Sequence, residues 1–197
     1  ALDHLNDSAR WGDDRFASEP ALAARVLAAA EKERDPLLVP EVAYALSFVD
    51  LTNTKLEDRV MELMKSDPRP AFRDKLVMSV GFRNKSERML AYLEERFDKG
   101  TPALRAGIMQ STRNSGPAYT CKLYGKAVAG SDKELALSAA TSLAFGHHCE
   151  DHYDAALGVM EKALPAMSGE NNVIVHGVGN ICETTEKPAQ KARGAKL

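Results

Sequence analysis

Six consecutive residues bring together side chains that commonly bind transition metals in proteins. The segment reads His147-His148-Cys149-Glu150-Asp151-His152 and holds three of the five histidines of the chain. If its side chains converge, His147, His148, Cys149 and His152 are the candidate metal ligands. The alternative is a polar turn in which Glu150 and Asp151 favour the N-terminus of the following helix. We favour the turn, because a helix that begins near Glu150 leaves His148 outside it, and we expect no cofactor or metal.

The three cysteines allow two redox states. One disulfide with a free thiol suits an oxidising compartment, and three free thiols suit a reducing one. Cys149 and Cys182 could form a disulfide if their Cα atoms lie within about 7 Å of each other. Cys121 falls in the middle of an expected helix, so we expect it to be a small buried hydrophobic residue.

Other chemistry has little support in the sequence. No phosphate-binding loop, dinucleotide fingerprint or Ser/His/Asp arrangement stands out. The chain has 26 basic and 28 acidic side chains, a net charge of −2, which makes nucleic acid an unlikely partner class. A local basic strip is conceivable, but an even scatter of surface charge explains the same residues, which are Arg83, Arg88, Arg113, Lys122 and Lys126.

The sequence is compatible with a cytoplasmic protein and with one that is exported after removal of a leader. No apolar run approaches the roughly 18 residues of a membrane-spanning helix, so we expect no membrane span. The chain begins at Ala1 rather than at methionine. We therefore expect either a processed form whose leader was removed or a fragment of a longer chain.

The elements that would position these residues repeat along the chain. Five segments have apolar residues at helical spacing, and they are Pro40–Val49, Pro70–Val80, Pro102–Ser111, Asp132–Phe145 and Asn172–Cys182. Equivalent positions in them are separated by 32, 31, 32 and 35 residues, and they are Leu46, Met78, Met109, Thr141 and His176. A fixed period in this range is typical of solenoids. The sequence therefore predicts an all-α fold, an α-solenoid of about five repeats.

A second amphipathic helix follows each of the first four segments, and these helices are Leu56–Met64, Ser86–Phe97, Pro117–Val128 and Asp151–Leu164. Asn53, Asn84 and Asn114 recur at the turns between paired helices, where asparagine tolerates cap or left-handed geometry. This pattern divides the chain into three parts, namely capping helices at 1–35, a solenoid at 36–183 and a basic, flexible tail at 184–197.

The repeats have proline at the start of the first helix, as at Pro40, Pro70 and Pro102, and alanine-rich first helices, as in Glu41–Leu46 and Leu135–Ala140. In these features the chain resembles the HEAT-repeat family, especially its short bacterial form. The resemblance implies a right-handed superhelix of stacked antiparallel helix pairs. The chain departs from the family by its short period and by lacking a regular Asp/Arg ladder between repeats. Some HEAT-like enzymes bind iron through repeated His-Glu dipeptides, but no histidine here precedes a glutamate.

The expected function is non-catalytic binding of a protein or peptide on the concave surface of the solenoid. Large or charged side chains lie off the apolar stripe of the second helices and are the candidate contact residues. They are Arg88, Tyr92, Tyr119, Lys122 and His152. The alternative is a HEAT-like enzyme or lyase-type subunit that holds a cofactor or metal near His147–His152. His176 lies among apolar residues, and we expect it in the core.

Overall fold

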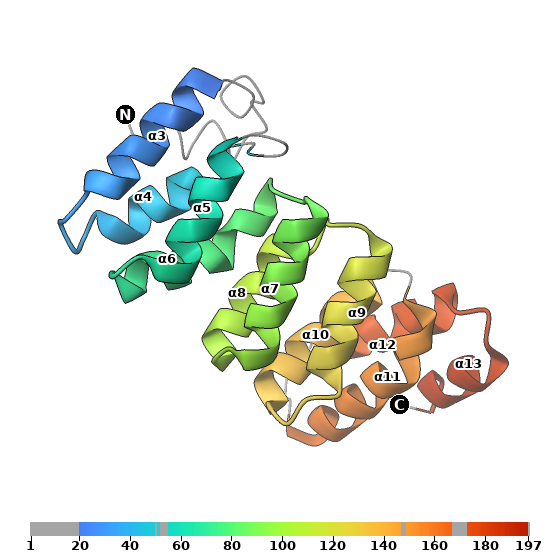
Figure 1. Cartoon of the computed structure of the whole chain (residues 1–197). Helices are drawn as coiled ribbons and strands as arrows, with labels where there is room; N and C mark the ends of the chain where they lie inside the picture. The colour runs from blue at the N-terminus through green and yellow to red at the C-terminus, as the bar shows by residue number, and fades with distance from the viewer. Residues whose placement is uncertain (1–19, 50, 52–54, 147–148, 167–172, 197) are drawn as a thin grey trace. The chain divides into compact units, whose positions relative to one another are not determined.

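A computed structural model of the chain describes residues 20–49, 51, 55–146, 149–166 and 173–196 (Figure 1). Within these ranges all regular secondary structure is helical, which confirms the predicted all-α class. None of the helices in the described ranges is long and apolar enough to span a membrane. The chain divides into two compact units, residues 1–114 and 115–197, and each is described by itself.

Unit 1 consists of two layers of helices. The layer that we call the first-helix layer contains α4 (Val39–Leu46), α6 (Pro70–Ser79), the 3-10 segment η1 (Val80–Phe82) and α8 (Pro102–Thr112). The second-helix layer contains α3 (Pro20–Lys32), α5 (Lys55–Ser66) and α7 (Glu87–Lys99). Helix α6 packs between α4 and α8, and the second-helix layer covers the first (Figure 1).

Unit 2 follows the same plan. Its first-helix layer contains α10 (Lys133–Gly146) and α12 (Val173–Thr184). Its second-helix layer contains α9 (Pro117–Val128), the 3-10 segment η2 (Glu150–His152), α11 (Tyr153–Ala163), the 3-10 segment η3 (Leu164–Ala166) and α13 (Pro188–Gly194). Helix α10 packs against α9, α11 and α12. The predicted third pair, α8 and α9, is divided between the two units.

The end of the chain differs from the prediction of a flexible tail. Residues 188–194 form α13, which packs on α12 and α11 and thus occupies the second-helix position beside α12. Gln190 is buried, its side chain donates to the Glu150 carbonyl at 3.2 Å, and Thr185 donates to its Oε1 at 2.6 Å. The sequence suggested a loose tail because the segment is basic and short, but its polar side chains find partners on η2 and α11.

Local capping chemistry sets several helix starts. The hydroxyl of Ser86 accepts from the Met89 N–H at 3.1 Å at the start of α7, and Thr101 does the same for Leu104 at 3.3 Å in α8. Asp132 accepts from the Leu135 N–H at 3.0 Å at the start of α10. Gly116 precedes α9 with a φ of 96°, a conformation that residues with a Cβ rarely adopt. Such side-chain caps typically contribute about 1 kcal/mol each.

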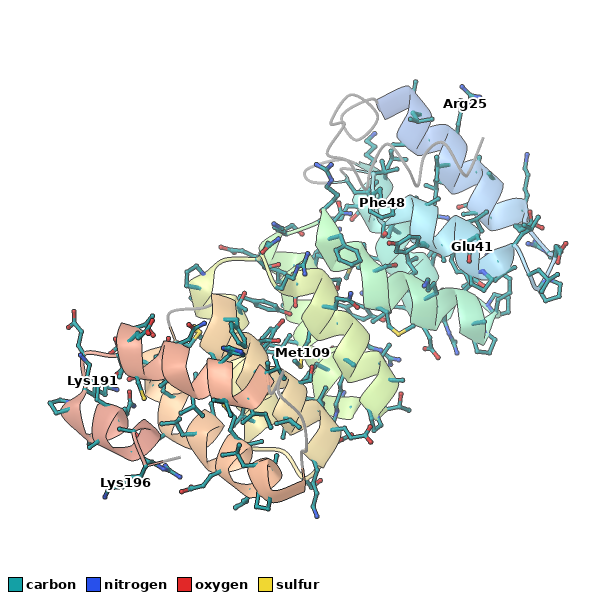
Figure 2. The ribbon with its side chains drawn as sticks, turned by 180° about the vertical axis from the view of Figure 1, so that it is seen from behind. Arg25, Glu41, Phe48, Met109, Lys191 and Lys196 are labelled. Atoms are coloured by element: carbon teal, nitrogen blue, oxygen red, sulfur yellow. A yellow bond between two sulfur atoms is a disulfide. The ribbon has the colours of Figure 1, made fainter. Side chains whose placement is uncertain are left out.

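The cores are mainly aliphatic. Leu46 and Leu93 in unit 1, and Leu143 and Leu157 in unit 2, are fully buried. Met109 is also buried, within unit 1 (Figure 2). Two positions on the repeating stripe differ from expectation. Met78 is only half-buried, although it packs closely on Gly107 of α8, where an added Cβ would come within 2.4 Å of it. His176 is exposed rather than in the core, because α12 buries the face that carries Ile174, Gly177, Val178 and Ile181.

Asn84 does not play the capping role that its place in the turn suggested. Its side chain is buried and reaches the preceding turn, where Oδ1 accepts from the Leu51 N–H at 2.7 Å and Nδ2 donates to the Val49 carbonyl at 3.1 Å. The N-cap of α7 is Ser86 instead. Asn84 therefore ties one turn to the next by completing backbone hydrogen bonds that the turn cannot make alone. Asn53 and the expected helix around Trp11 lie outside the described residues.

Candidate functional sites

Acid–arginine pairs connect successive second helices of unit 1. Arg59 of α5 binds Glu31 of α3 at 2.6 Å, and Arg88 of α7 binds Asp58 of α5 at 2.7 Å. The hydrogen bond to Asp58 raises the pKa of Arg88 above its usual range. The sequence did not indicate these pairs, because the acids and the arginines do not recur at identical repeat positions. The pairs are exposed, so each contributes little to stability, but together they fix the side chains of neighbouring helices.

Tyr92 lies beside these acid–arginine pairs. Its hydroxyl donates to the Met64 carbonyl of α5 at 3.1 Å, and the Lys65 ammonium lies 5.6 Å from the ring centroid. Partial burial of the phenol raises its pKa. Arg88 and Tyr92 thus both reach from α7 to α5. We call the surface made by Asp58, Lys65, Arg88 and Tyr92 the α5–α7 face.

The other three predicted contact residues lie in unit 2. Tyr119, which is half-buried, and Lys122, which is exposed, come from α9, and half-buried His152 comes from η2. The His152 ring packs directly on α9, since a Cβ added at Gly125 would lie 2.3 Å from one of its carbons. The five residues therefore form two groups, one in each unit. Whether either group binds a partner stays a prediction.

Cys149 forms a disulfide with Cys121, whose Cα lies 5.5 Å away. The expectation that Cys121 is a simple buried hydrophobic residue is therefore wrong, and so is a Cys149–Cys182 disulfide. The physical reason is the packing of η2 across α9, which brings Cys149 over Cys121. Cys182 is a free thiol whose sulfur lies 3.8 Å from the Lys191 carbonyl of α13. The disulfide encloses the whole of α10 in a loop, because the two cysteines are 28 residues apart.

The described part of the histidine-rich segment begins at Cys149. His147 and His148 lie outside the described residues. Cys149 offers no thiolate while it is disulfide-bonded, and the carboxylates are engaged with the C-terminal segment. Asp151 binds the Lys187 ammonium at 3.1 Å, and Glu150 accepts weakly from the Glu186 N–H at 3.4 Å. Among the described side chains, no group of three or more potential ligands has the spacing of a metal site.

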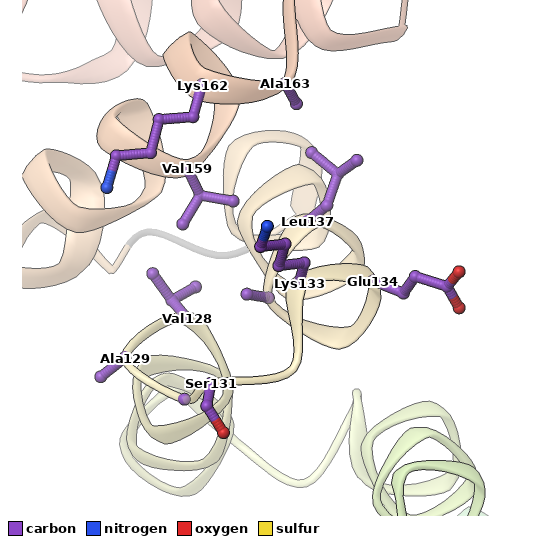
Figure 3. A pocket seen from close by; sticks show the side chains of 11 residues that line it. Val128, Ala129, Ser131, Lys133, Glu134, Leu137, Val159, Lys162 and Ala163 are labelled. Carbon is purple, nitrogen blue, oxygen red and sulfur yellow. The ribbon is translucent and has the colours of Figure 1, made fainter. Parts of the chain in front are cut away.

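A hollow that the sequence analysis missed lies in unit 2 between the ends of α9 and α11 and the start of α10. It encloses about 620 Å³ (Figure 3). Its apolar side chains include Val128, Leu137 and Val159, and two lysines, Lys133 and Lys162, also line it. The volume is within the range of small ligand sites, about 300–1,000 Å³.

Comparison with protein-family models finds no matching model, and comparisons with curated proteins and with solved structures find no match. The class that fold and sites define is therefore an all-helical protein whose helices pack in two layers in each unit.

Proposed function

We propose that this protein is a non-catalytic scaffold that binds a protein or peptide, and that its helix pairs form a HEAT-like α-solenoid. The repeat period supports the architecture, as does the two-layer plan shared by the units. Contacts about one repeat apart support it further. Examples are the pairs between Asp58 and Arg88 in unit 1 and between Asp151 and Lys187 in unit 2.

The observation that supports the functional proposal is that side chains of the α5–α7 face are already held in place before any partner binds. Arginine and tyrosine are the residue types most often found as interface hot spots. Immobilising a flexible side chain on binding costs about 0.5–1.5 kcal/mol. Arg88 and Tyr92 are already held by Asp58 and by the Met64 carbonyl, so a partner meets side chains that have lost much of this freedom.

The test begins with capture of a partner by the immobilised full chain, followed by measurement of its affinity for variants. Tyr92→Ala and Arg88→Ala remove the proposed contacts. Tyr44→Ala is the matched control, because Tyr44 is also half-buried but belongs to α4 in the first-helix layer. Lys122→Glu tests the group on α9 separately.

We expect Tyr92→Ala and Arg88→Ala to weaken binding at least about tenfold, or 1.4 kcal/mol, while Tyr44→Ala leaves it unchanged. Melting temperatures identify any variant that loses binding through unfolding. Unchanged binding by folded Tyr92→Ala and Arg88→Ala would reject the α5–α7 face. Turnover of a small molecule by the purified chain, abolished by a single substitution, would reject the scaffold itself.

A further inference from the structure

The hollow of unit 2 lies at a helix junction whose counterpart in unit 1 contains two larger side chains. At the corresponding junction of unit 1, Arg105 of α8 reaches back to the end of α7. Its Nε donates to the Phe97 carbonyl at 2.9 Å and its Nη2 to the Asp98 carbonyl at 3.0 Å. The guanidinium lies 5.7 Å from the centroid of the Phe97 ring. Arginine and phenylalanine together fill that junction.

The equivalent residues of unit 2 follow from the N-caps. Thr101 caps α8 and Asp132 caps α10, and each accepts from the N–H three residues on. Counted from these caps, Arg105 corresponds to Ala136. Counted from Ser86 and Gly116, which precede α7 and α9, Phe97 corresponds to Ala127. Ala136 lines the hollow, and so does Val128, the neighbour of Ala127.

The hollow combines an apolar wall with positive charge. Figure 3 shows the methyl groups of Val128 and Val159 turned toward each other and the Glu134 carboxylate pointing away. The Lys133 and Lys162 ammonium groups lie on either side of Val159 in this view. Neither lysine makes a hydrogen bond or ion pair with the part of the chain that the structure describes. Their stems cover apolar surface and their charges are available to an anion.

We infer that this hollow binds a peptide segment in which an acidic residue stands next to an aliphatic one. The aliphatic side chain fills the space that Phe97 and Arg105 fill in unit 1, between Val128 and Val159. The carboxylate binds the two ammonium groups at the rim. Charge complementarity selects this occupant, because a basic segment would meet Lys133 and Lys162 and a wholly apolar one would leave them without a counter-ion. The inference rests on the proposed function because it takes a peptide as the ligand. The site is a different one from the α5–α7 face.

The experiment is selection of peptides from a random phage-displayed library on the immobilised full chain. The affinity of a selected synthetic peptide is then measured by fluorescence anisotropy. We expect the selected sequences to share an acidic residue within two positions of Leu, Ile or Val. Replacing that acid by its amide should weaken binding at least about tenfold, and binding should weaken as salt rises from 0.05 to 0.5 M (these two concentrations bracket the roughly 10 Å screening length at about 0.1 M).

Two variants of the protein locate the site. Lys133→Gln with Lys162→Gln removes both charges from exposed positions, so it leaves the fold intact, and it should weaken binding at least about tenfold. Ala136→Arg restores the side chain that fills the junction in unit 1 and should abolish binding. Lys191→Gln is the control, since Lys191 is an exposed lysine of α13 outside the hollow.

Selection that yields no acidic–aliphatic motif overturns the inference, and so does affinity unchanged by the double lysine variant. The proposed function fails separately. Loss of partner binding in Tyr92→Ala tests the scaffold alone, and the effect of the double lysine variant on the selected peptide tests the hollow. Peptide binding that depends on the two lysines supports the hollow even where Tyr92→Ala has no effect.

Discussion

The two units share one plan and differ in what fills the junctions between helices. In unit 1, Arg105 and Phe97 close the end of α7, and Arg69 closes the end of α3. In unit 2, Ala127 and Ala136 occupy the positions of Phe97 and Arg105, a hollow remains, and a disulfide joins Cys149, which precedes η2, to α9. The apolar repeat period thus determines where the helices lie. The side chains at the helix ends determine whether the space between two helices is filled or left as a hollow.

The largest effect should come from the cores, which the comparison treats as equally well packed. Leu93 and Leu143 are both fully buried, one in each unit. We expect Leu93→Ala and Leu143→Ala each to lower the free energy of unfolding by about 3–5 kcal/mol, because the deleted methyl groups leave a cavity. Urea titrations measure both. A cost below about 1 kcal/mol for Leu143→Ala alone would mean that unit 2 is loosely packed throughout, not only at its hollow.

The disulfide should account for the next largest effect, and only in unit 2. Closing a loop between cysteines 28 residues apart restricts the unfolded chain and stabilises the fold by about 3–4 kcal/mol in the chain-entropy model. Cys121→Ser with Cys149→Ser should therefore speed amide hydrogen exchange in α9, α10 and α11. Mass spectrometry of the exchanged peptides measures this, with Cys182→Ser as the control. Equal acceleration in α4 and α6 would contradict the division into units.

In unit 1, Arg69 fills the junction at the end of α3, and its removal tests how much a filled junction stabilises the fold. It binds the buried carboxylate of Asp67 at 2.6 Å, donates to the Ala30 and Glu33 carbonyls of the α3 segment, and stacks on Phe72. Arg69→Met keeps an apolar stem over the ring but removes the two guanidinium bonds to Asp67, so that only the backbone N–H of residue 69 still donates to this carboxylate. We expect a loss of about 2–3 kcal/mol, the value for hydrogen bonds to charged groups.

The same contact predicts a pH dependence. The hydrogen bond from Arg69 holds the pKa of Asp67 below its usual value of 3.8. A carboxyl with a lowered folded-state pKa stabilises the protein above its unfolded pKa, and this contribution is lost as the pH falls through the folded one. Urea unfolding between pH 6 and pH 2 should therefore show a fall in stability below about pH 4 that is smaller in Arg69→Met. An identical fall in both proteins would assign it to other carboxyls.

The sequence was most informative where backbone hydrogen bonding and hydrophobic spacing act locally. Helix α9 was predicted over its full observed range, and Thr101-Pro102 marked the start of α8. Contacts between segments that lie far apart in the sequence were harder to predict. The bridge from Asn84 to the preceding turn, the Cys121–Cys149 pairing and the docking of α13 all join residues that sequence spacing alone does not bring together.

Among the candidate sites, the predicted contact residues Arg88 and Tyr92 did fall on adjacent positions of one face, because both lie off the apolar stripe of α7. The sequence does contain a feature that points to the hollow of unit 2. Aligning the repeats by their caps shows Phe97 and Arg105 replaced by Ala127 and Ala136. The sequence alone does not show that these replacements matter, because only the structure shows that Arg105 donates to the Phe97 carbonyl.

The most direct test of the comparison is a reciprocal exchange of the junction residues, with the unfolding free energies of Arg105→Ala and Ala136→Arg measured side by side. Arg105→Ala should cost about 1–3 kcal/mol, because it opens a filled junction and removes hydrogen bonds to the end of α7. Ala136 is buried but borders the hollow, so Ala136→Arg should change stability by less than about 1 kcal/mol, because the added side chain can extend into that space. A loss above about 2 kcal/mol for Ala136→Arg, with little change for Arg105→Ala, would contradict the account.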